Sequence, residues 1–180
     1  MGDADGFRLY HTPGPPLVRD WLYRPPTRAS DLRNQTISVR LAGADAPEGA
    51  HFGREAQPYA REAHEALRAM VEGRSVRLSL AHIDQYQRLV ATPYVWLPPY
   101  VLGPTNVSLA LVRRGLATVY RNAGATYGPA PWLARWMLDA QSGQTQLERA
   151  EEHAKRCGLG MWSLGRRLET PGAFKRRTHG

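Results

Sequence analysis

Several short segments of the chain alternate hydrophobic and polar residues, a pattern that predicts β-strands. The clearest is residues 36–41, where apolar side chains fall on one face and Arg40 on the other. Such alternation is typical of a half-buried strand with an arginine on its solvent face. It predicts further strands over residues 7–11, 75–80 and 88–96. Because Pro93 cannot donate a ladder hydrogen bond, we expect the last strand to lie at an edge or to carry a bulge.

Apolar residues recur at helical spacing elsewhere, and this predicts three helices. They cover residues 57–71, 106–114 and about 131–156. Asn106 is a favourable N-cap for the second helix, and Gly115 ends it. The third helix can break near Gly143. With no internal repeat and no interdomain linker, this order of elements predicts a small α+β barrel.

The composition fits one globular domain with a basic surface. Of 180 residues 42% are hydrophobic, and 24 Lys and Arg against 16 Asp and Glu give a net charge of +8. A surface of this charge attracts polyanions such as nucleic acid or anionic membranes, without distinguishing them. Cys157 is the only cysteine, which excludes an internal disulfide and a thiolate metal cluster. No apolar run approaches the roughly 18 residues of a membrane span.

One short segment combines a cation with two carboxylates. Residues 40–48 read RLAGADAPE, so Arg40, Asp45 and Glu48 follow one another at the end of a predicted strand. Arg88 begins another predicted strand. Each of these residues alone is weak evidence, because most arginines are solvated surface charges and most turn aspartates bind the backbone. Together, two arginine forks can hold one phosphodiester and stabilise the charge of its transition state.

Carboxylates this close to a phosphate site would repel the substrate unless a cation lay between them. Oxygen ligands without nearby histidine or cysteine favour Ca²⁺ or Mg²⁺ over zinc. The segment therefore predicts a phosphate site that depends on a divalent cation.

These residues belong to a longer set of motifs. The set comprises VRLAGADAPE at 39–48, DQYQR at 84–88, VRRGLA at 112–117 and GLGMWS at 158–163. In order and spacing it resembles the staphylococcal nuclease (thermonuclease-like) family over residues 3–163. FRLYH at 7–11, HFGR at 51–54 and LETP at 168–171 most resemble the fungal, membrane-anchored branch that is associated with mitochondria.

The resemblance implies a five-stranded OB-fold-type β-barrel with three helices. It implies a nuclease-like domain over residues 3–163, followed by a basic C-terminal tail over residues 164–180. In the fungal branch a single transmembrane helix precedes the nuclease domain. We therefore expect this chain to be the soluble part of a longer, membrane-anchored mitochondrial protein.

The resemblance also implies a metal site. Asp45, Asp5 and the backbone carbonyl of Ala46 would hold Ca²⁺, with Mg²⁺ or another divalent ion as the alternative. Asp5 lies close to the start of the chain, where we expect fraying. Ala46 replaces a threonine typical of the bacterial enzyme, which matters little if only the carbonyl binds the metal.

The remaining roles concern the substrate, which in this family is single-stranded or frayed DNA or RNA. Glu48 would act as the general base or position the attacking water. Arg40 and Arg88 would bind the phosphate, with P–O5′ cleavage leaving a 3′-phosphate. Tyr86 would either contact a nucleotide or pack against the barrel.

Two further positions and one insertion depart from the family pattern. Gln87 replaces a glycine, so we expect the turn before Arg88 to be relaxed enough for a side chain. Gly6 stands where a small hydroxyl residue is usual. Residues 131–143 form an insertion, whose two tryptophans we expect to serve packing.

Two alternatives to a nuclease remain. Some nuclease-like domains bind single-stranded nucleic acid without cutting it. A basic tail can also bind anionic lipid head groups. Its cations are Arg166, Arg167, Lys175, Arg176 and Arg177. Nothing in the sequence predicts a protein partner.

Overall fold

The computed structural model describes residues 4–12, 26, 28, 30–50, 55–121 and 143–179. The main sheet comprises β1 (Gly6–Tyr10), β2 (Thr36–Leu41), β4 (Val76–Ile83), β5 (Leu89–Val95) and β6 (Thr105–Asn106). A smaller sheet pairs β3 (Ala44–Asp45) with β7 (Thr118–Val119). The helices are α2 (Ala60–Val71), α3 (Val107–Arg113), α5 (Gly143–Arg156) and α6 (Pro171–His179), with 3₁₀ turns η1 (Tyr100–Leu102) and η2 (Gly160–Arg167).

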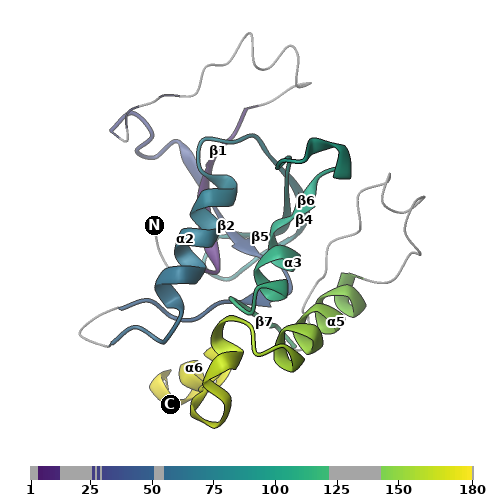
Figure 1. Cartoon of the computed structure of the whole chain (residues 1–180). Coiled ribbons are helices and arrows are strands. Elements are labelled where there is room, and N and C mark those ends of the chain that lie inside the picture. The colour runs from purple at the N-terminus through teal and green to yellow at the C-terminus, as the bar shows by residue number, and fades with distance from the viewer. Residues whose placement is uncertain are drawn as a thin grey trace.

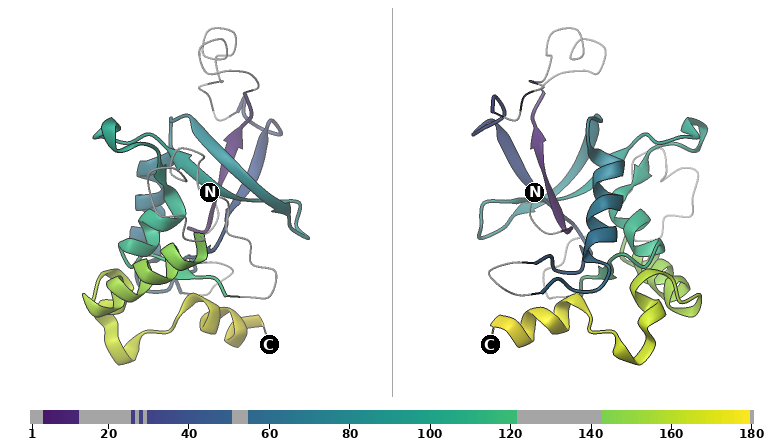
Figure 2. Two further views of the ribbon diagram at one scale, coloured as in Figure 1. Left: turned by 90° about the vertical axis from the view of Figure 1, so that its right-hand side faces the viewer. Right: turned by 60° about the vertical axis from the view of Figure 1, so that its left-hand side comes forward.

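The main sheet has the order β1-β2-β5-β4, and β6 pairs with the far end of β5. Among the described strands of this sheet, β2 and β5 run parallel and the other pairs are antiparallel. Figures 1 and 2 show α2 and α3 on one side of this sheet and α5, η2 and α6 beyond its lower end. The α+β class and the five strands are as predicted. Among the described residues, no strand pair closes the sheet into a complete barrel.

Of the two alternatives for the strand that contains Pro93, the edge position was wrong, since β5 is the central strand of the sheet. A bulge is present in its ladder with β4, where the register shifts between Leu80 and His82. On one side β5 pairs with β4 along its whole length, and Pro93 lies opposite Leu78 there. On the other side its neighbour changes from β2, which pairs up to Ala91, to β6, which begins at Tyr94. The proline thus occupies the gap between two partners, where one ladder is already interrupted.

Sequence periodicity correctly located the core-facing sides of the helices. The buried residues of α2 are Ala60, Ala63, Leu67, Met70 and Val71. Burying such a stripe removes roughly 25 cal/mol of unfavourable hydration per Å² of apolar surface. Asn106 caps α3 as predicted, because its side chain accepts a hydrogen bond from Leu109 N at 3.1 Å. Two segments discussed from the sequence lie outside the described residues. They are residues 131–142, which belong to the predicted third helix and to the insertion, and the HFGR motif at 51–54.

Helix α6 was not predicted from the sequence. Pro171 suits a first helical turn because the missing N–H needs no intrahelical partner there. Thr170 supports the start, as Phe174 N donates to its carbonyl at 2.9 Å. The helix lies across the lower end of the molecule (Figure 1). Within the described parts of the chain, no helix has the length and apolar character needed to cross a membrane.

Candidate active site

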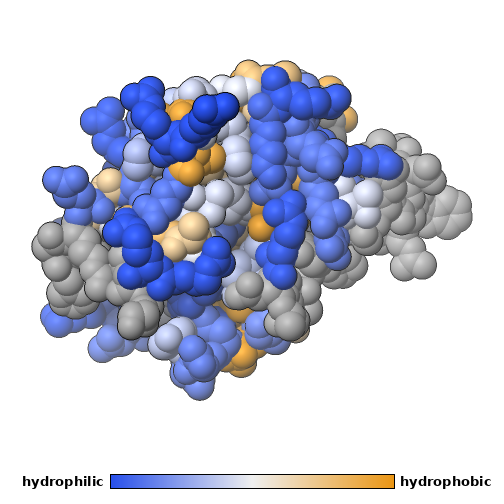
Figure 3. Space-filling model, turned by 90° about the horizontal axis from the view of Figure 1, so that it is seen from below, coloured by the Kyte–Doolittle hydropathy of each residue, from blue (hydrophilic) through white to orange (hydrophobic). Residues whose placement is uncertain are grey.

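A cleft of about 690 Å³ opens where the ends of β2, β3 and β7 meet α5 and α6. Charged side chains dominate its lining, and they include the residues singled out from the sequence. They are Asp5, Arg40, Asp45, Glu48, Arg88, Arg121, Glu151, Lys155, Lys175 and Arg176, with the aromatic rings of Tyr86, Tyr120 and Trp162. Hydrophilic residues cover most of the lower face of the molecule (Figure 3).

Arg40 enters the cleft from the solvent face of β2, as its alternation predicted. Its Nη2 lies 3.5 Å from Asp5 Oδ2 and 3.8 Å from Asp45 Oδ1. The guanidinium also lies over the Tyr120 ring, 5.4 Å from the ring centroid. Two carboxylates and an aromatic ring therefore orient Arg40. Neither carboxylate forms a close bidentate pair with its guanidinium group.

Asp5 lies immediately before β1, close to the start of the chain, and its backbone is tied to the end of β2. It is 6% exposed, and its carbonyl accepts a hydrogen bond from Leu41 N at 2.9 Å. The neighbouring Gly6 allows this approach, because a Cβ there would lie 2.7 Å from the carbonyl oxygen of Val39. The glycine that departs from the family pattern thus fits the close contact of β1 with β2.

Asp45 is fixed by the small sheet. It pairs with Thr118 across β3 and β7, and the Thr118 hydroxyl donates to its backbone carbonyl at 3.2 Å. Asp45 is 3% exposed, and Ala46 is completely buried beside it. The carboxylate therefore sits at a rigid point of the backbone.

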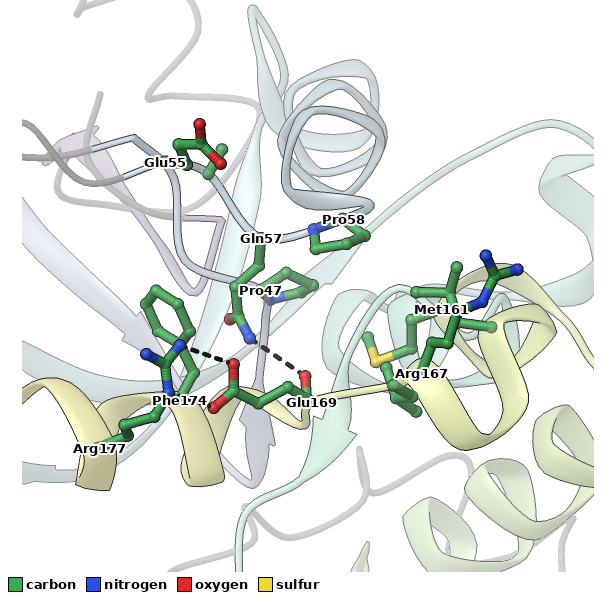
Figure 4. Close-up of a pocket in the computed structure, with 12 residues that line it drawn as sticks. Pro47, Glu55, Gln57, Pro58, Met161, Arg167, Glu169, Phe174 and Arg177 are labelled. Carbon is green, nitrogen blue, oxygen red and sulfur yellow. Dashed lines mark hydrogen bonds and ion pairs between the residues drawn. The ribbon is translucent and has the colours of Figure 1, made fainter.

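Glu48 is held by a glutamine that sequence reasoning did not select. Gln57 Oε1 accepts from Glu48 N at 2.9 Å, and Gln57 N donates to the Glu48 carbonyl at 2.9 Å. Gln57 Nε2 donates to the carbonyl of Glu169 at 3.1 Å (Figure 4). A buried glutamine thus joins the Glu48 loop to the segment that leads into α6, a link that no local sequence pattern signals.

A second cleft, of about 500 Å³, lies beside this link. Figure 4 shows Glu169 between Gln57 and Arg177, with Phe174 adjacent. Arg177 Nε and Nη2 donate to the two carboxylate oxygens of Glu169 at 2.8 and 2.9 Å. The paired contact attaches α6 to the preceding segment.

Lys175 of α6 reaches the point where the acidic groups meet. Its Nζ lies 2.6 Å from Asp45 Oδ1, 2.9 Å from Glu48 Oε1 and 3.8 Å from Asp5 Oδ2. Burial favours the neutral amine, but the charges of Asp45 and Asp5 and the hydrogen bonds to Asp45 and Glu48 outweigh it. The pKa of Lys175 is consequently raised above its ordinary value. Sequence analysis had assigned this lysine only to a basic tail.

Arg88 lines the same cleft but is oriented by a different partner. Its Nε lies 2.7 Å from Asp84 Oδ2, while Asp84 Oδ1 accepts the backbone N–H groups of Tyr86 at 2.8 Å and Arg88 at 2.9 Å. Burial raises the pKa of Asp84, but these hydrogen bonds prevail and lower it. Tyr86 is 69% exposed, with the Arg88 guanidinium 5.3 Å from its ring centroid.

The expectation of a relaxed turn before Arg88 was wrong. Gln87 has φ 60, the left-handed conformation in which a side chain is unfavourable. Asp84 offsets the strain, because its carboxylate and carbonyl bind the turn at both ends. The turn keeps a glycine-like backbone without the glycine.

Glu151 of α5 anchors the far wall of the cleft and was also missed. It is 1% exposed, and it accepts hydrogen bonds from Val119 N at 2.8 Å, Arg121 Nη2 at 2.6 Å and Lys155 Nζ at 2.8 Å. Burial raises its pKa, but the hydrogen bonds from Lys155, Val119 and Arg121 outweigh this and lower it. Glu151 thus fixes β7, which in turn positions Asp45.

The donor set suits a hard cation. Asp5, Asp45 and Glu48 all face one positive group, the Lys175 ammonium, which stands in for a cation at this point. Carboxylate oxygens are the ligands that Ca²⁺ and Mg²⁺ prefer. Among the described residues, no group of three Asp, Glu, His or Cys side chains has the arrangement of a metal site. The carboxylates that face Lys175 are close enough to bind one cation together, and that cation is the lysine ammonium.

Comparison with known proteins gives consistent results. The family model described as "Staphylococcal nuclease homologue" matches residues 38–164. A protein named "Probable endonuclease LCL3" from Clavispora lusitaniae is 45% identical over 179 residues, covering 98% of this chain and 70% of that protein. "Probable endonuclease lcl3" from Aspergillus flavus is 48% identical over 188 residues, covering 98% and 64%. The chain therefore spans about two thirds of these relatives' length.

Proposed function

The chain belongs to the staphylococcal nuclease family, and on that premise we propose that it is a calcium-dependent endonuclease that hydrolyses phosphodiester bonds of DNA or RNA. The observation that carries the proposal is the convergence of Arg40, Asp5, Asp45 and Glu48 within one cleft that Arg88 also lines. The relatives' printed names support nuclease activity.

In this proposal the two arginines bind the scissile phosphate. Arg40 is 22% exposed and Arg88 is 29% exposed, so each keeps N–H groups within reach of the cleft. Asp84 aligns the Arg88 fork. Negative charge accumulates on the phosphoryl oxygens in the transition state. Two prealigned guanidinium groups therefore stabilise the transition state more than the ground state.

Glu48 is the proposed general base. Its carboxylate reaches the cleft, and Gln57 holds its backbone on both sides. It would take a proton from the attacking water, and cleavage of the P–O5′ bond would leave a 3′-phosphate. A positioned base of this kind contributes roughly 10²–10⁴-fold to the rate.

Asp45, Asp5 and the Ala46 carbonyl are the proposed ligands of Ca²⁺, with Mg²⁺ as the alternative. Their oxygen donors fit such an ion, as does the burial of both aspartates. When bound, the ion would supply positive charge to the phosphate and shield it from the carboxylates. Tyr86, exposed beside Arg88, is the proposed nucleotide contact.

A non-catalytic module that binds single-stranded nucleic acid is the competing function. One observation favours it, since Lys175 already neutralises the carboxylates that a metal would need. In that case the basic cleft would bind the substrate without cleaving it.

Incubation of the protein with labelled single-stranded DNA and RNA distinguishes the two functions. We expect cleavage with Ca²⁺, none with EDTA, and 3′-phosphate ends on the products. Binding without cleavage in Ca²⁺ or Mg²⁺ would establish the binding module instead. Cleavage that is equal in Ca²⁺ and EDTA would refute the metal requirement.

We further propose that the full-length protein is mitochondrial, with a transmembrane helix ahead of the nuclease domain, as in the branch it resembles. The relatives are longer than this chain, which spans 64–70% of the two compared above. Imaging of the tagged full-length protein in cells tests this location. A diffuse cytosolic signal would contradict it.

A further inference from the structure

The Lys175 ammonium lies among the carboxylates that include the two aspartates proposed above as metal ligands. Its Nζ is 2.6 Å from Asp45 Oδ1 and 2.9 Å from Glu48 Oε1. Calcium lies about 2.3–2.6 Å from its oxygen ligands. The ammonium fills the point from which Asp45, Glu48 and Asp5 are all reached, and a divalent ion held by the same aspartates a few ångströms away would be repelled by its charge.

The position of Lys175 follows from the way α6 is held against the rest of the domain. The Lys175 side chain is 27% exposed, and two contacts hold the segment that precedes it. Gln57 holds the Glu169 carbonyl, and Arg177 binds the Glu169 carboxylate. Both contacts lie on the side of α6 that faces the second cleft (Figure 4). They place the helix so that Lys175 points at the carboxylates.

We propose that α6 is an internal competitor of the metal ion. In the state described here, Lys175 neutralises Asp45, Asp5 and Glu48 and closes the site. A divalent cation binds only after the ammonium has left these carboxylates, and its binding loosens α6. The proposal rests on the proposed function in one respect, that Asp45 and Asp5 are metal ligands.

Two consequences follow from this competition. The apparent association constant for the metal equals the intrinsic constant multiplied by the fraction of molecules in which Lys175 has left the site. By reciprocity, metal binding weakens the docking of α6 by the same factor. The C-terminal segment, which the sequence marks only as basic, would thereby set the metal concentration at which the enzyme becomes active.

Calorimetric titration with Ca²⁺ alone, without nucleic acid, tests the proposal in the full chain. Lys175→Met removes the competing charge and keeps an unbranched side chain. Arg176→Met is the matched control, because Arg176 lies on the same helix, lines the same cleft and carries the same charge. We expect Lys175→Met to bind Ca²⁺ about tenfold more tightly than wild type, and Arg176→Met about twofold or less. Equal or weaker binding by Lys175→Met would overturn the proposal.

Lys175→Met leaves three carboxylates facing one another, so circular dichroism must first show that it is folded. Hydrogen exchange of the wild-type protein tests the proposal without any variant. Adding Ca²⁺ is expected to speed amide exchange in residues 171–179 and to leave α2 unchanged. Exchange in α6 that stays constant or slows while Ca²⁺ binds would contradict the competition.

Failure of this proposal differs from failure of the proposed function. A wild-type protein that cleaves nucleic acid, with Ca²⁺ affinity unchanged in Lys175→Met, refutes only the competition. Tighter Ca²⁺ binding by Lys175→Met together with no cleavage by any form supports the competition and refutes the nuclease assignment. If neither the wild-type protein nor a variant binds Ca²⁺, both the competition and the calcium requirement of the proposed function are refuted.

Discussion

Replacing Glu151 by glutamine removes the buried charge that ties β7 to α5. The carboxylate accepts three hydrogen bonds, from Val119 N, Arg121 Nη2 and Lys155 Nζ. Glutamine keeps the shape and one acceptor oxygen, so the backbone bond to Val119 can survive. Its amide N–H groups would instead face the two cations.

The magnitude follows from how exposed those cations are. Arg121 is 53% and Lys155 42% exposed, so each pair is worth only about 0.5 kcal/mol after screening by solvent. An unsatisfied amide donor in a buried position costs about 1 kcal/mol more. We therefore expect Glu151→Gln to lower the free energy of unfolding by about 2 kcal/mol, or the Tm by about 4–8 °C.

Urea unfolding followed by circular dichroism measures this loss. Glu152→Gln is the control, since it makes the same change at the exposed neighbouring position and should alter stability by less than about 0.5 kcal/mol. Similar losses in the two variants would refute the view that Glu151 holds the wall of the cleft.

The difference between wild type and Glu151→Gln should also depend on pH. Burial raises the pKa of Glu151, but its hydrogen bonds lower it by more, so the folded-state pKa lies below the ordinary value of 4.5. A depressed pKa stabilises the fold above the unfolded-state pKa, and that contribution is lost as pH falls through the folded-state pKa. The two proteins should therefore differ most near neutral pH and converge in acid, once the pH has fallen below the depressed folded-state pKa of Glu151.

Two further predictions concern the turn before Arg88. Gln87→Gly should raise the free energy of unfolding by about 1 kcal/mol, because glycine adopts a positive φ without steric cost; a loss of stability in urea unfolding would contradict the turn geometry. Asp84→Asn should lower cleavage more than Arg77→Gln, a surface control on β4, since Arg88 Nε loses its 2.7 Å charged partner. An unchanged kcat/KM for Asp84→Asn would show that Asp84 does not position Arg88.

Local patterns were sufficient for much of the fold. Alternation located β2 at residues 36–41 and put Arg40 on its solvent face, and helical periodicity identified the buried side of α2. The cap at Asn106 was predictable because it depends on residues three positions apart. The central position of β5 was not, since Pro93 is tolerated only through the change of neighbours from β2 to β6.

The supporting residues of the site were beyond local patterns because each acts across a long sequence separation. Gln57 joins Glu48 to Glu169, and Glu151 reaches Val119. Lys175 contacts Asp45, although the two are 130 positions apart. In the sequence these residues look like ordinary polar positions on a helix or in a basic tail. The motif at residues 40–48 identified the centre of the site. The residues that hold this centre in place could be found only from tertiary contacts.

Single-turnover cleavage of single-stranded DNA by Glu48→Gln, at saturating Ca²⁺, tests whether Glu48 is the general base of a nuclease. Glutamine keeps the size of the side chain and removes the base. We expect the cleavage rate to fall by about 10²-fold or more, while DNA binding changes little. A variant that cleaves at the wild-type rate would contradict the assignment of Glu48 and, with it, the proposed active site.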